Sequence, residues 1–214
     1  MLLKMLGNIT DPFMIIAFIL FLIIPLLFSL ALHELAHGYV AYKFGDPTAK
    51  MMGRLTLNPF KHLDVTGTIL LLVIGLGWAK PVPVNILNIP NRTQQMLVAL
   101  AGPLSNILLA IFCAILLMIH SNYVSLPMDT ITIILGALIR INLGLAVFNL
   151  LPIPPLDGSR ILSWLLPQSV EEKMQSAERF GFVILLLIMF TIGFGWVFNI
   201  VDVVQKHLYM MLGI

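Results

Sequence analysis

The sequence predicts an all-α integral membrane protein, a small polytopic helical bundle of about four to six membrane segments with one short extended, β or re-entrant element. Hydrophobic residues make up 59% of the 214 residues and charged residues 10%, whereas soluble domains carry roughly 25% charged residues. So few charges cannot cover a globular surface, and lipid must therefore cover much of this one. Several apolar runs also reach the roughly 20 residues that a spanning helix needs. By contrast, three prolines within residues 80–90 exclude a helix there, and the valines between them favour extended backbone.

The apolar runs predict five membrane segments, which we assign to a single membrane-embedded domain covering residues 1–214. The first run is one long or kinked helix, because dividing it at Pro25 leaves two pieces that are each too short to cross a bilayer. It is also longer than the core of a cleavable signal peptide. The second run is too short to cross as a helix, which favours a partial or re-entrant segment. The expected segments are residues 13–43, 66–79, 93–119, 131–151 and 181–204.

Lysine and arginine are distributed unevenly between the loops. Residues 43–92 hold six of them and residues 152–180 hold three, whereas residues 120–130 hold none. Because basic residues concentrate on the cytoplasmic side, we expect the first two regions to face the cytoplasm and the third to face outside. No basic stripe interleaved with aromatics occurs, so the sequence gives no support for nucleic-acid binding. Arg140 falls inside a membrane segment, and we expect it to face the bundle interior or a neighbouring acid.

Residues 33–37 read His-Glu-Leu-Ala-His, an H-E-x-x-H motif within the first membrane segment. On a helix, residues four apart share one face, so His33 and His37 can reach the same ion while Glu34 projects toward bound water. Catalytic zinc takes three protein ligands and leaves one position for water or substrate. Ionisable groups inside a membrane are costly and are seldom kept without a function. The alternative is that these side chains satisfy one another in a polar bundle core.

A third ligand has to come from His, Asp or Glu, because the single cysteine, Cys113, lies inside an apolar run. Most acids lie in loops, at segment ends or beside basic residues on a solvated face. Asp157 differs, because it follows a segment that enters the cytoplasmic side, where His33 also lies. The prolines of residues 149–158 break that helix, and Gly158 permits a tight turn that aims the carboxylate back into the bundle. By itself this stretch is a turn; together with the histidine motif it makes Asp157 the best candidate for the third ligand.

These motifs together resemble those of the site-2 protease family of intramembrane metalloproteases. The similar stretches are residues 33–37, residues 101–106 (Ala-Gly-Pro-Leu-Ser-Asn) and residues 149–158 (Asn-Leu-Leu-Pro-Ile-Pro-Pro-Leu-Asp-Gly), and the resemblance covers residues 25–165. Residues 53–59 and 77–85 resemble the compact subgroup without appended domains. Accordingly, no PDZ domain interrupts this sequence and no CBS pair follows its last segment.

The resemblance implies one zinc ion per chain, held by His33, His37 and Asp157, with Glu34 as the general base that activates water. It also implies a multi-pass membrane protein with its active site toward the cytoplasm. The compact chain leads us to expect a prokaryotic cell membrane. The expected substrates are transmembrane proteins or peptides, cleaved within or near their membrane segments. Such cleavage serves regulated intramembrane proteolysis or the clearance of signal-peptide remnants.

Two further features bear on catalysis. Asn106 and Asn149 are amides close to membrane segments and are candidates for oxyanion or substrate contacts, although hydrogen bonds between helices explain them equally well. A helical substrate must unwind before its backbone can be attacked, and residues 82–88 are suited to pair with the unwound strand by strand addition. The alternative for this stretch is a turn at the membrane surface that is shaped by proline.

Other classes of function fit the sequence less well. A metal transporter or channel would need polar residues stacked across several segments, whereas the ionisable groups here gather in the cytoplasmic half of the bundle. An inactive homologue that acts as a chaperone for membrane segments would not need Glu34. Another architecture of membrane zinc peptidases takes a downstream Glu as the third ligand, but no Glu lies in a later segment of this chain.

Overall fold

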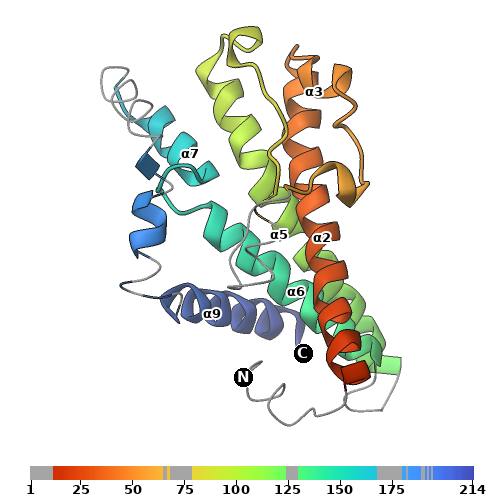
Figure 1. Ribbon diagram of the computed structural model, residues 1–214. Helices are drawn as coiled ribbons and strands as arrows, with labels where there is room; N and C mark the ends of the chain where they lie inside the picture. Colours follow the sequence, from red (N-terminus) through yellow and green to blue (C-terminus); the bar gives the residue numbers. More distant parts are fainter. Residues whose placement is uncertain are drawn as a thin grey trace.

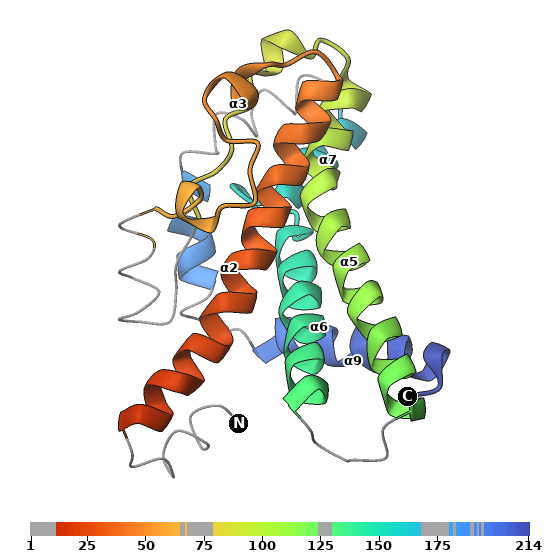
Figure 2. The same cartoon turned by 90° about the vertical axis from the view of Figure 1, so that its right-hand side faces the viewer.

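The computed structural model describes residues 12–64, 67, 79–123, 130–167, 180–181, 183–188, 191, 193 and 195–214. Its helices are α2 (Pro12–Lys43), α3 (Thr48–Met51), α5 (Arg92–Tyr123), α6 (Thr130–Asn149), α7 (Asp157–Leu165) and α9 (Gly195–Leu212), with 3-10 turns at Pro59–Lys61 and Ile86–Asn88. The long helices α2, α5 and α6 pack together, and α9 lies across α5 and α6 (Figure 1, Figure 2). The described residues contain no β-sheet, so the predicted all-α class is confirmed.

Three helices of the described part are long and apolar enough to cross a membrane: α2, α5 and α6. α2 passes Pro25 without ending, which confirms the prediction of one long first helix. It ends just before Gly45, whose φ of 101° lies in the left-handed region that favours glycine. The outward faces of these helices carry many exposed large apolar side chains, as expected of surfaces that contact lipid.

Small side chains allow α5 to pack closely against α6 and α9. Ala110 and Cys113 of α5 are buried in one apolar cluster with Ile139 of α6. Small residues are typical of helix interfaces in membranes, where close packing replaces much of the hydrophobic driving force. α6 and α9 are also joined by an ion pair, in which Arg140 Nη1 donates to Asp202 Oδ1. The expectation that Arg140 faces a neighbouring acid is therefore confirmed.

The segment expected at residues 181–204 is interrupted within the described residues, and the span itself stays a prediction. Gly193 has a φ of 74° and is not helical, and α9 begins at Gly195 and lies across α5 and α6. A run of apolar residues is long enough to span by composition alone, but glycine permits a backbone conformation that ends a helix within it. The partial segment expected at residues 66–79 lies outside the described residues except at positions 67 and 79.

The extended segment, residues 80–85, is not helical and lies against α2, and Asn85 at its end has extended backbone angles. Residues 86–88 form a 3-10 turn instead, so the predicted extended backbone ends at Asn85. Val82 packs at Gly38 of α2, where an added Cβ would lie 2.8 Å from Val82 Cγ1. Arg54 Nη2 donates to the carbonyl of Lys80 at 2.7 Å. The glycine and the arginine together hold the extended segment close to the helix that carries the H-E-x-x-H motif.

Asp46 fixes the other end of the extended segment. Its buried carboxylate accepts hydrogen bonds from the backbone N–H and hydroxyl of Thr48, from the backbone N–H of Asn85 and from the side-chain amide of Asn88. Burial raises the pKa of the Asp46 carboxyl, but these hydrogen bonds lower it by more, so that the pKa lies below its ordinary value. Asp46 is therefore a charged anchor between the end of α2 and the extended segment.

Candidate metal and catalytic site

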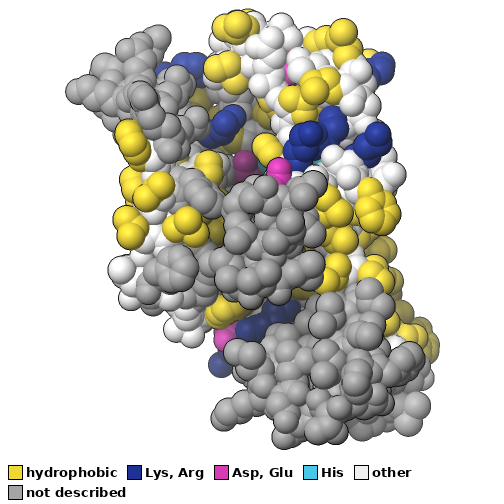
Figure 3. All heavy atoms as spheres, in the orientation of Figure 1, with side chains coloured by type: hydrophobic (Ala, Val, Ile, Leu, Met, Phe, Trp, Pro, Cys, Tyr) yellow, Lys and Arg dark blue, Asp and Glu magenta, His cyan; other side chains and the backbone are white. Residues whose placement is uncertain are grey.

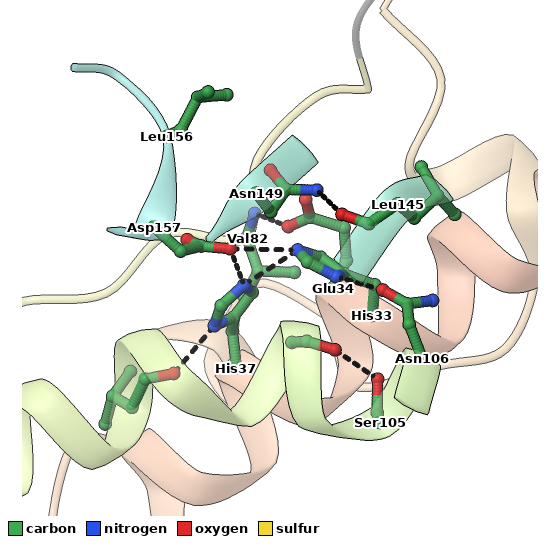
Figure 4. Close-up of polar contacts among 12 residues, drawn as sticks. His33, Glu34, His37, Val82, Ser105, Asn106, Leu145, Asn149, Leu156 and Asp157 are labelled. Carbon is green, nitrogen blue, oxygen red and sulfur yellow. Dashed lines mark hydrogen bonds and ion pairs between the residues drawn. The ribbon is translucent and has the colours of Figure 1, made fainter. Parts of the chain in front are cut away.

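Two histidines and one aspartate from distant parts of the chain meet inside the bundle (Figure 4). His33 and His37 lie one turn apart on α2, and Asp157 is the first residue of α7. His33 Nε2 lies 3.0 Å from His37 Nε2, and Asp157 Oδ2 lies 3.2 Å from the first and 3.3 Å from the second. The structure thus brings together the three residues that were predicted to bind the metal, and both imidazoles are buried.

The opposite nitrogen of each imidazole is hydrogen-bonded to α5. His37 Nδ1 donates to the backbone carbonyl of Val98 at 2.7 Å, and His33 Nδ1 donates to Asn106 Oδ1 at 2.7 Å. Carbonyl oxygens only accept, so in the neutral imidazoles the proton is on Nδ1 and each Nε2 keeps its lone pair. A hydrogen bond on the other ring nitrogen is also how metal-binding histidines are usually oriented.

The charge distribution at this point calls for a cation. The two Nε2 lone pairs and the Asp157 carboxylate repel one another at these distances when no positive charge lies between them. Asp157 Oδ2 is buried and has no hydrogen-bond donor among the described residues, which is costly for a carboxylate oxygen. One bound cation would satisfy all three atoms. Two imidazoles and one carboxylate are also the ligand set of many catalytic zinc sites, so these residues fit zinc.

Gly102 of α5 leaves space beside the two imidazoles. A Cβ added at Gly102 would lie 2.6 Å from His33 Nε2 and closer still to His37 Nε2. Any side chain at this position would occupy the volume next to the converging nitrogen atoms. The glycine therefore lets α5 lie against the site while keeping the point of convergence open.

The loop after α6 determines where Asp157 lies. α7 begins at Asp157, and a Cβ added at the next residue, Gly158, would lie 2.5 Å from the carbonyl oxygen of Leu151 and closer still to that of Leu150. The φ of Gly158 is not in the left-handed region. The predicted need for glycine is therefore right in position, but its reason is the close approach of two backbone segments rather than a special turn conformation.

The extended segment holds the carboxylate of Glu34. Glu34 Oε2 accepts a hydrogen bond from the backbone N–H of Val82 at 2.7 Å (Figure 4). Glu34 follows His33 directly on α2, so this bond ties the predicted general base to the segment that passes the site. The remaining oxygen, Oε1, has no hydrogen bond to any residue that the structure describes.

The two asparagines predicted as oxyanion or substrate contacts occupy different positions. Asn106 is fully buried and bonds to His33 Nδ1, which faces away from the point where Asp157 and the Nε2 atoms converge. Its amide donates to Asn142 of α6 at 2.9 Å, so the alternative of a hydrogen bond between helices describes its contacts. Asn149 donates to the carbonyl of Leu145 within α6 at 2.9 Å.

Sequence reasoning missed several groups that build the site. The carbonyl of Val98 and the N–H of Val82 are backbone groups, which every residue type carries and which leave no signal in a sequence. Asn142 and Ser29 could have been found, because a polar side chain within a membrane helix is costly and usually has a specific partner.

An H-E-x-x-H helix inside a membrane bundle, completed by a carboxylate from a second helix, defines a membrane-bound metalloprotease. Comparison with known proteins agrees with this class. The model of peptidase family M50, the site-2 protease family, matches residues 21–131 and 123–192, and the chain belongs to this family. The predictions of the family, of a zinc metalloprotease and of zinc as the cofactor are therefore confirmed.

Curated relatives carry matching names. YwhC of Bacillus subtilis (strain 168), named "Putative zinc metalloprotease", is 49% identical over 179 residues, which cover 80% of this chain and 80% of the relative. Rip2 of Mycobacterium tuberculosis (strain ATCC 25618 / H37Rv), named in the same way, is 32% identical over 209 residues, or 91% of this chain and 76% of the relative. "Zinc metalloprotease MJ0392" of Methanocaldococcus jannaschii is 30% identical over 145 residues, or 68% and 34%. No solved structure matches the chain.

Proposed function

We propose that this protein is a single membrane-embedded domain that hydrolyses peptide bonds within or near the transmembrane segments of membrane proteins. The observation that carries the proposal is the convergence of His33, His37 and Asp157 between helices that are long and apolar enough to lie in lipid. In this proposal the three side chains hold one zinc ion. When bound, zinc supplies the Lewis acidity that lowers the pKa of water toward about 7 and polarises the scissile carbonyl.

Glu34 acts as the general base and then as the general acid. Its carboxylate takes a proton from the attacking water as the water oxygen bonds to the carbonyl carbon of the substrate. It then passes this proton to the amide nitrogen as the carbon–nitrogen bond breaks. The hydrogen bond from Val82 N–H to Glu34 Oε2 orients the carboxylate, so that Oε1 is the oxygen left for the water. Asn149, at the end of α6, remains a candidate contact for the substrate carbonyl.

Of residues 82–88, which were expected to pair with an unwound substrate by strand addition, residues 82–85 supply such an edge, whereas residues 86–88 form a 3-10 turn. In an extended chain, residues two apart present their backbone groups to the same side. Asn85 faces Asp46, whereas Val82 faces Glu34, so Val84 presents its N–H and carbonyl toward the catalytic side. The substrate strand would lie beside the base that activates the water. This arrangement suits transmembrane proteins or signal-peptide remnants, processed in regulated intramembrane proteolysis or in clearance.

The site is proposed to face the cytoplasm from a multi-pass position in a prokaryotic cell membrane. Two of the loop regions, residues 43–92 and 152–180, carry nine basic residues between them, and residues 120–130 carry none. Figure 3 shows most of the visible Lys and Arg side chains at the upper end of the molecule, where α3 lies. Basic side chains concentrate on the cytoplasmic side of membranes. The lipid bilayer and a membrane-protein substrate are then the partners that the protein needs.

Zinc analysis of the purified protein, together with cleavage of a model transmembrane segment, tests the proposal. We expect one zinc ion per chain, retained in Glu34→Gln and weakened in Asp157→Ala, with cleavage lost in both variants. His37→Ala should also lose zinc, and His207→Ala is its matched control, because His207 lies exposed on α9 and, among the described residues, bonds to Val203 of the same helix. Zinc binding without cleavage of any of several substrates would favour a metal transporter or an inactive homologue, and folded wild type without zinc would rule the proposal out.

A further inference from the structure

We infer that Asn142, with Ser29, is a positioning residue for the metal site, because it fixes the amide of Asn106 and thereby the proton of His33. The inference rests on the proposed role of His33 as a metal ligand. It concerns three helices: Ser29 and His33 lie on α2, Asn106 on α5 and Asn142 on α6. Ser29, Asn106 and Asn142 are each 0% exposed, so water cannot replace any of their partners.

The orientation of Asn142 is set by a backbone carbonyl. Asn142 Nδ2 lies 2.8 Å from the carbonyl oxygen of Leu138, one turn earlier on α6, and 2.9 Å from Ser29 Oγ. A carbonyl oxygen can only accept, so the atom that faces Leu138 must be the amide nitrogen. Both amide hydrogens of Asn142 are then in use. Its oxygen, Oδ1, must point the other way, toward Asn106.

The orientation of Asn106 follows from that of Asn142. The oxygen of Asn142 can only accept, so Asn106 must turn its nitrogen toward it, and the distance between the two atoms is 2.9 Å. The backbone carbonyl of Ser29, at 3.4 Å from the same nitrogen, favours the same orientation. Asn106 is left with its oxygen directed at His33 Nδ1, at 2.7 Å. That nitrogen must carry the proton, and His33 Nε2 must therefore present its lone pair to His37 and Asp157.

The two imidazoles are thus fixed by different routes to the same end. His37 bonds directly to the backbone carbonyl of Val98, whereas His33 depends on two amides in series that end at a backbone carbonyl. A reversed Asn106 amide would place oxygen against oxygen at Asn142 and nitrogen against the protonated Nδ1 of His33. A shift of the His33 proton to Nε2 would relieve the second mismatch, but the contact between the two oxygens at Asn142 would remain, and no water reaches this buried site to satisfy them. Asn142 therefore excludes the tautomer of His33 that cannot bind metal through Nε2.

The test compares zinc affinity in two backgrounds that differ at Asn106. Zinc affinity is measured by competition with a chromophoric chelator on purified protein in detergent, without reference to cleavage. In the natural background, Asn142→Leu should weaken zinc binding by about 10- to 100-fold, the usual loss when a partner behind a ligand is removed. Asn199→Leu, an exposed asparagine on α9, is the matched control and should leave zinc affinity unchanged.

The second background is Asn106→Asp. A carboxylate has two equivalent oxygens, so it accepts from His33 Nδ1 in either orientation and needs no partner to orient it. Asn142→Leu should then cost little zinc affinity. An equal loss in both backgrounds would mean that Asn142 supports the fold alone, and would overturn the inference. Unchanged affinity of Asn142→Leu in the natural background would overturn it as well.

A milder variant protects the test against a failure to fold. Ser29→Ala removes one of the two acceptors of Asn142 and should weaken zinc binding by about threefold in the natural background and not with Asn106→Asp; the same loss in both would again sink the inference. A wild-type protein that binds no zinc would refute the proposed function itself. Wild type with zinc and Asn142→Leu with undiminished zinc would refute the positioning role alone, so the two failures can be told apart.

Discussion

Gly102→Ala should abolish tight zinc binding while leaving the helix intact. The added Cβ would lie 2.6 Å from His33 Nε2, about 0.8 Å short of the 3.4 Å at which ordinary van der Waals contact begins. Metal–ligand distances tolerate only about 0.2 Å, so the imidazoles would have to move by several times that amount. Because a displacement near 1 Å can cost about 100-fold at a site that depends on orientation, we expect zinc affinity to fall by about 100-fold or more.

The loss of zinc affinity in Gly102→Ala can be measured as the difference in thermal or chemical stability with and without zinc. At a zinc concentration of about 100 times the wild-type Kd, binding stabilises the wild type by about 2.7 kcal/mol, whereas a variant that binds 100-fold more weakly gains about 0.4 kcal/mol. Without zinc, the imidazoles can turn away from the methyl group at the cost of their hydrogen bonds to Val98 and Asn106, about 1 kcal/mol each. Alanine is a better helix former than glycine by about 1 kcal/mol, so the metal-free variant should lose less stability than the zinc-bound one.

Gly144→Ala provides the matched control on α6. A Cβ added there meets no atom within 4 Å, so the same substitution gains helix propensity without touching the site. We expect Gly144→Ala to bind zinc like the wild type and to be as stable or slightly more so. If Gly102→Ala also bound zinc with wild-type affinity, the metal could not lie where His33, His37 and Asp157 converge, and the geometric reasoning would be refuted.

Three other outcomes follow from contacts around the site. Val82→Pro removes the N–H that holds Glu34 in a stretch already extended and flanked by proline, so kcat should fall by about 10- to 100-fold with zinc retained; the same loss in Val82→Ala would point to packing instead. Asp46→Asn should lower the free energy of unfolding by about 2 kcal/mol at neutral pH. Because the pKa of Asp46 is lowered on folding, the wild type keeps this contribution above about pH 4 and loses it as the pH falls through the folded-state pKa. Denaturant unfolding at neutral and acidic pH should show that the free energy of unfolding of the wild type falls with pH by an amount that the variant lacks. In a double-mutant cycle, Arg140→Leu and Asp202→Leu should show a coupling free energy of at most about 1 kcal/mol. If their effects on stability in thermal unfolding were strictly additive, their ion pair would contribute nothing.

Some predicted features rest on local properties of the sequence. Membrane helices are decided by the length of apolar runs, and the H-E-x-x-H spacing places His33 and His37 on one face of any helix that contains them. These predictions hold because every α-helix has about 3.6 residues per turn and the hydrocarbon core of a bilayer has a typical thickness of about 30 Å, whatever the sequence. At residues 181–204, composition alone did not reveal the left-handed Gly193 that precedes α9.

The sequence by itself therefore determined the membrane class, the family and the two histidine positions. The sequence also named Asp157 as the candidate third ligand, which the structure places beside the two histidines. The tertiary structure decided which distant backbone groups complete the site: the carbonyl of Val98 and the N–H of Val82. The physical reason is that a backbone carbonyl or N–H is present in every residue. Its role depends on which helix packs beside it, and that is settled by packing across the whole bundle rather than by any local pattern.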